Sequence, residues 1–302
     1  MLNAPAATLR ARQPTLLVVG CGDVGLRVLR LLPAHWRVYA LTSSPARVPE
    51  LRAAGAVPLL GNLDEPRTLG RLGPLAERVL HLAPPPGQGE DDPRTAALLR
   101  ALWRGGRVRQ LVYGSTSGVY GDCAGALVDE TRAVQPATAR ALRRVQAERR
   151  VRHFGRASGC TTTVLRIPGI YAPDRAGGDL RERVIRGAPV LVADDDVHTN
   201  HIHADDLARA CVVALLRGRP QRVVHASDDS DLKMGDCYDL VADLWGLTRP
   251  PRVTREEAVR QLPAVTLSFM SESRRLVNAR LKDELRVRPR HPTVREGMAP
   301  PA

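Results

Sequence analysis

The hydrophobic positions in the first two-thirds of the chain fall into short, nearly continuous runs separated by amphipathic stretches. Continuous runs are typical of parallel strands that are buried on both faces. They predict strands at residues 15–20, 37–42, 57–61, 79–83, 110–114 and 161–167. The first amphipathic stretch places Val24, Val28 and Leu31 on one helical face, and Pro33 ends that helix. The other stretches predict helices at residues 46–54, 66–72, 94–104 and 137–153. This alternation predicts an α/β fold with a doubly wound parallel sheet of the Rossmann type.

After Pro168 the pattern becomes less regular, and loops rich in Gly, Pro and Asp separate short elements. We expect helices at residues 205–217, 234–245, 255–261 and 274–284, and strands at 190–193 and 221–226. The chain therefore divides into a disordered tail (1–13), a Rossmann domain (14–168) and a smaller substrate lobe (169–302). We expect the lobe to be partly interleaved with the first domain.

Composition places the chain in the cytoplasm. Its five cysteines are scattered and never form a C-x-x-C pair, which argues against a disulfide framework and favours a reducing compartment. No apolar run approaches the roughly 18 residues that a membrane helix needs. The amino-terminal residues carry no apolar block of the signal-peptide type. We therefore expect a soluble cytoplasmic protein with no membrane partner.

The net charge of +13 comes from 45 basic residues, of which only Lys233 and Lys282 are lysines. A basic excess can indicate a nucleic-acid partner. Here the arginines are spread along the whole chain, and 2 Phe and 5 Tyr offer little for stacking bases. We interpret the excess as arginine in place of lysine on solvated surfaces, and a nucleic-acid partner is not expected.

The sharpest motif is a glycine-rich turn between the first strand and the first helix. It reads Gly20, Cys21, Gly22, Asp23, Val24 and Gly25. The first glycine permits a tight turn, the second lets backbone N–H groups approach a pyrophosphate, and the third allows close packing of helix on strand. The helix N-terminus adds partial positive charge. In this strand–turn–helix context the motif predicts dinucleotide binding.

The end of the second strand bears on the choice of cofactor. An NAD site normally carries an acidic residue there to hold the ribose 2′-hydroxyl. This chain has Thr42, Ser43 and then Arg47 instead, which suit a 2′-phosphate. The alternative is that Ser44 simply caps a helix before Pro45. We expect NADP rather than NAD.

Four further residues complete the predicted cofactor site. We expect the adenine to lie beside the third strand and the rest of the cofactor to face the end of the fourth. The residues at these two places are Asn62, Leu63, Ala83 and Pro84.

Three later segments resemble the extended short-chain dehydrogenase/reductases, which include the NAD-dependent epimerase/dehydratase proteins. They are VYGSTSGVYG at residues 112–121, LRIPGIYAP at 165–173 and NHIHADDLA at 200–208. The likeness covers residues 14–292 and is closest to an uncharacterised subgroup with G-x-G-x-x-G. It implies nucleotide-sugar chemistry for the superfamily and specifies no substrate. It also implies that the helix at 137–153 borders the active site and often a homodimer interface.

The resemblance assigns roles to single residues. Thr116 stands at the family's catalytic Ser/Thr position, although a strand-end hydroxyl can also simply cap a turn. Pro168 would lie against the nicotinamide. Four residues would contact the substrate: Ser117, Tyr120, Tyr171 and Arg175.

The family's Tyr-x-x-x-Lys dyad is replaced. Counting back from the helical Glu148 puts the lysine position at Arg144 and the tyrosine position at Arg140. A guanidinium holds its proton and cannot replace a phenol in proton transfer. Arg144 can still contact the nicotinamide ribose, and Arg140 can hold an anionic substrate. Any turnover would then recruit Tyr120 or Tyr171, or need no acid from the protein.

The cluster of His198, His201, His203, Asp205 and Asp206 invites a metal interpretation. We expect no metal, because this segment enters a helix for which Asp205 or Asp206 is a natural N-cap.

The sequence leaves three hypotheses. The first is an NAD(P)-dependent oxidoreductase or epimerase/dehydratase acting on a polar small molecule such as a nucleotide sugar. The second is an NADP(H)-binding sensor or scaffold without turnover. A third, weaker hypothesis is an RNA- or polyanion-binding protein that kept the fold.

Overall fold

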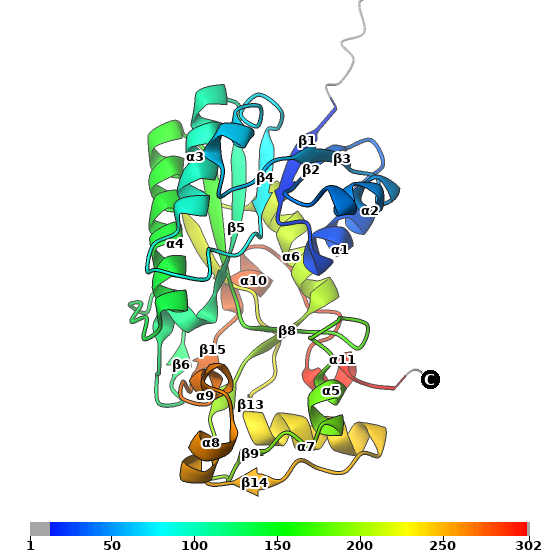
Figure 1. The fold of residues 1–302 in the computed structure, drawn as a ribbon, viewed down its shortest axis with the longest axis vertical. Helices are drawn as coiled ribbons and strands as arrows, with labels where there is room; N and C mark the ends of the chain where they lie inside the picture. Colours follow the sequence, from blue (N-terminus) through cyan, green and yellow to red (C-terminus); the bar gives the residue numbers. More distant parts are fainter. Residues whose placement is uncertain (1–12, 301–302) are drawn as a thin grey trace, which may run out of the picture.

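A computed structural model describes residues 13–300 (Figure 1). The predicted tail, residues 1–13, lies outside them except for its last residue. Seven parallel strands form one sheet, in the order β3-β2-β1-β4-β5-β7-β12. From one edge to the other the strands are β3 (Val57–Leu60), β2 (Arg37–Thr42), β1 (Thr15–Val19), β4 (Arg78–His81), β5 (Gln110–Thr116), β7 (Thr161–Ile167) and β12 (Arg222–His225). This is the predicted α/β fold of the Rossmann type.

Helices cover both faces of the sheet and bury alternate residues of its strands. On β1, Leu16 and Val18 join the core beneath one set of helices, whereas Leu17 and Val19 join the core beneath the other. The first set is α1 (Asp23–Leu31), α2 (Val48–Ala53) and α6 (Ala204–Arg217), and the second is α3 (Pro93–Gly105) and α4 (Ala139–Ser158). The predicted helix at 66–72 is only a 3₁₀ turn, Pro66–Leu69.

The smaller part of the molecule is built on short strand pairs. The pairs are β8 (Gly169–Tyr171) with β11 (His201–His203), β10 (His198–Thr199) with β13 (Leu232–Lys233), β9 (Val190–Leu191) with β14 (Arg252–Val253), and β6 (Leu127–Val128) with β15 (Arg275–Leu276). The helices are α5 (Leu180–Ile185), α7 (Met234–Trp245), α8 (Arg255–Gln261), α9 (Ala264–Phe269), α10 (Ala279–Asp283) and α11 (Val294–Gly297). Residues after 168 also supply β12 and α6 of the main sheet.

The predicted helix at 274–284 is wrong in its first half. Arg275 and Leu276 form β15 instead, and the side chain of Asn200 accepts a hydrogen bond from the Leu276 N–H at 2.8 Å. A pairing to residues more than 70 positions away therefore overrides the local helical preference. The helix α10 begins only at Ala279.

Within residues 13–300, no helix combines the length and the apolar composition that crossing a bilayer requires.

Candidate functional site

The glycine-rich turn adopts the geometry that a pyrophosphate requires. Gly20 has a φ of 86°, and a Cβ there would lie 2.3 Å from the backbone nitrogen of Ala83. Gly22 is the N-cap residue of α1. A Cβ added to Gly22 would meet no atom within 4 Å. A Cβ on Gly25 would lie 3.1 Å from Cys21 Sγ. The space in front of Gly22, at the start of α1, is thus open, so the turn fits the phosphates of a dinucleotide.

Two cavities flank this turn, and Gly20, Gly22 and Leu82 line both of them. The cavity towards β2 and β3 has a volume of about 520 Å³, and the cavity towards β5 and β7 has about 330 Å³. We call them the adenosine-side cavity and the nicotinamide-side cavity, after the halves of a dinucleotide that they fit. The predicted cofactor residues divide between them. The adenosine-side cavity is lined by Cys21, Thr42, Ser43, Arg47, Asn62, Leu63, Ala83 and Pro84. The nicotinamide-side cavity is lined by Asp23, Val24, Arg144 and Pro168.

No carboxylate follows β2 in the adenosine-side cavity. The strand ends at Thr42, whose hydroxyl accepts a hydrogen bond from the Ser44 N–H at 3.2 Å. Ser44 precedes a 3₁₀ turn without a side-chain capping bond, so the capping alternative finds no support. Two arginines line this cavity, and each contacts an acid: Arg47 binds Glu50 at 2.8 Å and Arg94 binds Asp64 at 2.6 Å.

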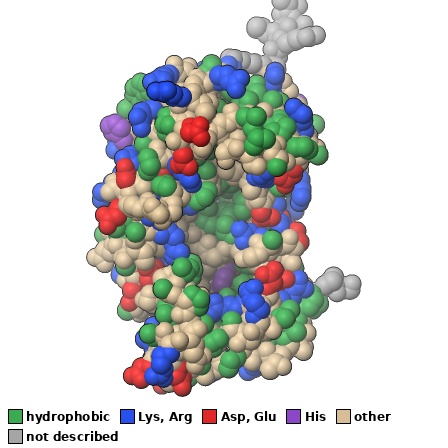
Figure 2. All heavy atoms as spheres, in the orientation of Figure 1, with side chains coloured by type: hydrophobic (Ala, Val, Ile, Leu, Met, Phe, Trp, Pro, Cys, Tyr) green, Lys and Arg blue, Asp and Glu red, His purple; other side chains and the backbone are tan. Residues whose placement is uncertain are grey.

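A third cavity, of about 410 Å³, opens between the sheet and the smaller part of the molecule. We call it the substrate cavity. It shares Thr116, Pro168 and Ile170 with the nicotinamide-side cavity. Figure 2 shows the molecule hollowed in the middle of this face, with basic side chains around the hollow. A molecule in the substrate cavity would therefore meet a dinucleotide at Thr116.

Thr116 ends β5 at the junction of these two cavities. Its Oγ1 accepts a hydrogen bond from the Gly118 N–H at 3.2 Å and so caps the 3₁₀ turn Ser117–Tyr120. The predicted capping role is therefore real. It uses only a lone pair, which leaves the hydroxyl hydrogen free to donate to a bound oxygen.

The two arginines at the dyad positions lie on α4, one turn apart, and differ in their partners. Arg144 lines the nicotinamide-side cavity and donates from Nη1 to the Gly114 carbonyl at 2.8 Å and to the Tyr113 hydroxyl at 3.1 Å. Arg140 lines the substrate cavity and lies over the ring of Phe269, 4.5 Å from its centre.

The sequence pattern of the NAD dependent epimerase/dehydratase family matches residues 16–226. The chain belongs to this family. Solved structures agree over nearly its whole length. A functionally unknown conserved protein from Silicibacter pomeroyi is 31% identical, with a TM-score of 0.79, 94% of this chain and 96% of that chain covered. The UDP-glucose 4-epimerase of Thermotoga maritima is 20% identical, with a TM-score of 0.78 and the same coverage.

A third relative was solved with NAD. It is DesIV, a dTDP-glucose 4,6-dehydratase of Streptomyces venezuelae, which is 20% identical, with a TM-score of 0.76 and 94% of each chain covered. Among curated proteins, none matches the chain. The epimerase/dehydratase family thus accounts for the fold and for the dinucleotide turn.

Tyr120 is not placed to donate a proton in the substrate cavity. It is 1% exposed and lies outside the residues that line the substrate cavity. Its hydroxyl accepts a hydrogen bond from Arg166 at 2.6 Å and contacts His225 Nε2. Burial raises the pKa of Tyr120 to about 12, against the opposing effect of Arg166. The expectation of a substrate contact at Tyr120 is therefore corrected, because the side chain belongs to a buried network.

That buried network supports α4 and β5 of the family fold. Glu148 accepts hydrogen bonds from Ser115 Oγ at 2.6 Å and from Arg166 at 2.7 Å. The side chains of Glu148 and Arg166 are each 6% exposed, so each charge is compensated by the other, because an unpaired charge would be costly to bury. The sequence signalled only Glu148, by its spacing from the dyad positions.

The other predicted substrate residues are placed differently. Ser117 and Tyr171 line the substrate cavity, but Tyr171 is fully buried and donates to the Thr293 carbonyl at 3.1 Å. Burial raises the pKa of Tyr171 well above its ordinary value. Arg175 lies instead beside the nicotinamide-side cavity and donates to Asp23 at 3.1 Å. We correct its expected place in the substrate cleft accordingly.

A buried arginine that the sequence did not single out ties the glycine-rich turn to the smaller part of the molecule. Arg27, on α1, is 6% exposed and pairs with Asp23 at 3.1 Å, Asp174 at 2.7 Å and Asp205 at 2.6 Å. Only its spacing of four residues from Asp23 on one helix face was visible in the sequence. The partners Asp174 and Asp205 lie 147 and 178 residues away.

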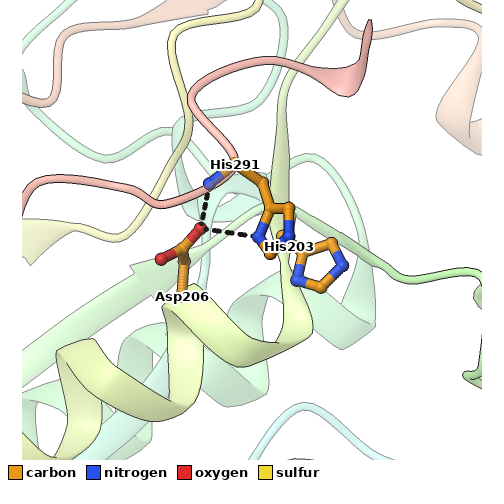
Figure 3. A group of neighbouring side chains, drawn as sticks. All are labelled: His203, Asp206 and His291. Carbon is orange, nitrogen blue, oxygen red and sulfur yellow. Dashed lines mark hydrogen bonds and ion pairs between the residues drawn. The ribbon is translucent and has the colours of Figure 1, made fainter. Parts of the chain in front are cut away.

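Two residues of the predicted histidine cluster, His203 and Asp206, lie beside His291 (Figure 3), and their arrangement suits packing and hydrogen bonding. His203, Asp206 and His291 come close enough to hold an ion. However, the rings of His203 and His291 stack, with centres 3.7 Å apart and planes at 25°. Nitrogen lone pairs lie in the ring planes, so stacked rings do not converge on one metal. Asp206 also accepts the backbone N–H groups of Arg290 and His291, both at 2.8 Å.

This cluster also corrects the predicted start of α6. The N-cap is His203, whose Nδ1 accepts from the Asp205 N–H at 3.2 Å, and neither Asp205 nor Asp206 caps the helix. Asp206 instead fastens the carboxyl-terminal segment to α6.

Proposed function

We propose that this chain is an NADP(H)-dependent oxidoreductase or epimerase that acts on a polar small molecule in the substrate cavity. One observation carries the proposal: Thr116, Pro168 and Ile170 line both the nicotinamide-side cavity and the substrate cavity. A nicotinamide held there supplies a hydride donor or acceptor. The solved relatives that act on nucleotide sugars make that class the first one to test.

The preference for NADP(H) rests on the residues at the end of β2, where a carboxylate that would repel a 2′-phosphate is missing. The end of β2 offers the hydroxyls of Thr42 and Ser43 in place of a carboxylate, and Arg47 and Arg94 line the same cavity. A ribose 2′-phosphate suits guanidinium groups and is repelled by an acid at this position. Two of the solved relatives were solved with NAD, so the proposed preference for NADP(H) would distinguish this chain from them.

In this proposal the chain's own residues position the substrate and leave proton transfer to water. Thr116 donates its hydroxyl hydrogen to the reacting oxygen of the substrate, and Arg144 holds a fixed positive charge beside it. Tyr120 and Tyr171 keep their protons, because burial raises both pKa values. The exposed side chain of Arg140 lines the substrate cavity, so the cavity is open to solvent and water can exchange the proton.

A second candidate is an NADP(H)-binding sensor without turnover. The observation in its favour is that both dyad positions hold arginine, which cannot act as a general acid or base near neutral pH. The five cysteines are free and buried, which suits a cytoplasmic place for either candidate.

The experiment is a two-step assay on the purified protein. Fluorescence titration measures NADPH and NADH binding. With the oxidised cofactor bound, absorbance at the nicotinamide band then follows net hydride transfer from UDP-glucose, dTDP-glucose and UDP-glucuronic acid, and chromatography of the sugar nucleotides detects epimerisation or dehydration, which return the hydride and leave the absorbance unchanged. Binding with turnover supports the enzyme, and binding without turnover on any compound supports the sensor. Absence of dinucleotide binding contradicts both.

A further inference from the structure

Arg140 is a charged group in the substrate cavity without a charged partner. It lies on the first turn of α4, and its guanidinium stacks on Phe269. Among the described residues, no ion pair or hydrogen bond engages this guanidinium. Stacking on an aromatic ring fixes the plane of the guanidinium and leaves its edge for a ligand.

The other charges of the cavity largely cancel one another. Glu272 pairs with Arg274 at 2.8 Å, Glu182 with Arg186 at 4.0 Å, and Asp179 with Arg181 outside the cavity at 2.6 Å. Arg183 remains and stacks on Tyr238, 4.9 Å from the ring centre. The cavity therefore keeps Arg140 and Arg183, which form no ion pair with an acidic residue within the described range 13–300, and its surplus charge favours an anionic ligand.

The position of Arg140 in the cavity indicates which part of the ligand carries the negative charge. Arg140 precedes Arg144 by four residues, so the two side chains share one face of α4. Arg144 lines the nicotinamide-side cavity, and Thr116 lines both that cavity and the substrate cavity. Arg140 thus stands at the end of the substrate cavity where the reacting carbon would lie.

We propose that the substrate carries a carboxylate either on the reacting carbon or on the carbon next to it, and that Arg140 binds this carboxylate through its two parallel N–H groups. The proposal rests on the proposed function, since it names the substrate class of the same site. A planar carboxylate matches the fork of a guanidinium in a bidentate pair. Two kinds of molecule present this chemistry: a small 2-oxo or 2-hydroxy acid, and the uronic acid of a nucleotide sugar.

The test compares matched ligands that differ in the carboxylate. Calorimetric titrations use UDP-glucuronic acid against UDP-glucose on the NADPH-saturated protein, and 2-oxobutanoate against butan-2-one on the NADP⁺-saturated protein, so that neither pair can exchange a hydride with the cofactor. Each titration is repeated with Arg140→Gln and with Arg152→Gln. Arg152 is exposed on the same helix and lies outside the cavity, so it serves as the control.

We expect one carboxylate ligand to bind about tenfold more tightly than its neutral partner. Arg140→Gln removes this preference and leaves NADPH binding unchanged, and Arg152→Gln changes neither. The pair that shows the preference identifies the source of the carboxylate. Equal affinity within both pairs, no binding of either acid, or a preference that survives Arg140→Gln overturns the inference. NADPH binding is measured in the same samples, so its absence is recognised as failure of the proposed function instead.

Discussion

Arg144 donates a hydrogen bond from Nη1 to the carbonyl oxygen of Gly114 at 2.8 Å, which fastens α4 to the end of β5. The resemblance in sequence, counted from Glu148, predicts that Arg144 occupies the lysine position of the family's dyad. The guanidinium keeps the positive charge and adds a bond to the strand that ends at Thr116. On this prediction the charge beside the nicotinamide-side cavity is retained, whereas the position one turn earlier has arginine in place of the phenol.

Restoring the dyad should create a proton path. We expect Arg140→Tyr with Arg144→Lys to raise kcat for hydride transfer at saturating substrate by about 10²-fold, the lower end of general acid–base catalysis, and to raise KM for a carboxylate substrate because Arg140 is lost. The phenol should also introduce a new pKa into the pH–rate profile. Steady-state kinetics with any substrate that turns over measures both. Arg140→Phe with Arg144→Lys is the control, since it has the ring without the hydroxyl, and an equal gain in that variant contradicts the account.

Substitutions at two glycines of the turn should affect dinucleotide binding and folding stability differently. Gly22→Val places its side chain in open space, so stability should be unchanged while dinucleotide binding is abolished. Gly20→Ala should lower the free energy of unfolding by at least about 2 kcal/mol, because its φ is positive and a Cβ meets backbone. Urea denaturation and NADPH titration distinguish the two effects. Retained binding in folded Gly22→Val would show that the pyrophosphate lies elsewhere.

Cofactor choice should follow the residues after β2. Arg47→Ala should weaken NADPH binding by about 1–3 kcal/mol and leave NADH binding little changed, the range for charge-assisted hydrogen bonds. Thr42→Asp should weaken NADPH and strengthen NADH, because an acid there holds a free 2′-hydroxyl. Fluorescence titration measures both cofactors. Arg52→Ala, an exposed arginine on α2, is the control, and an equal loss of both cofactors in Arg47→Ala would contradict the 2′-phosphate assignment.

Acid should destabilise the fold through its buried histidines. Burial lowers the pKa of His81 to about 3 and those of His201, His203 and His225 to about 4. The unfolded chain takes up these protons near pH 6.5, so the stability that the neutral rings confer is complete above that pH and is lost as the pH falls towards 4. Between pH 7 and pH 5 we expect a loss of about 2 kcal/mol for each ring.

Asp228 has the opposite effect on the free energy of unfolding as the pH falls. Burial raises its pKa to about 7, so the folded state holds that proton more tightly than the unfolded chain and gains stability as the pH falls from 7 to 4. Asp228→Asn removes the gain and should steepen the acid loss. Urea denaturation of both proteins at pH 7 and pH 5 tests this, and a free energy of unfolding that does not change with pH would contradict it.

The sheet was predictable because its strands are buried on both faces and appear in the sequence as continuous apolar runs. The glycine-rich turn was visible because its position after β1 and before α1 gives the motif its meaning. The smaller part was less predictable, because strands such as β8 and β15 have two or three residues and exist only through distant partners. The same cause hid the partners of Arg27.

In the candidate site, too, some features could be predicted from the sequence and others could not. Thr116 and the dyad positions followed from spacing along β5 and α4. The burial of Tyr120 did not, because Arg166 and His225 reach it from two other strands of the sheet. Arg175 was misplaced because its partner Asp23 is 152 residues away.

The most direct test of the central claim, preferential NADP(H) binding at the glycine-rich turn, is an equilibrium titration of the wild-type protein with NADPH and with NADH. We predict a dissociation constant for NADPH about tenfold or more below that for NADH, since a 2′-phosphate gains the guanidinium of Arg47 and meets no carboxylate after β2. Equal constants, a lower constant for NADH, or no binding of either cofactor would contradict the account.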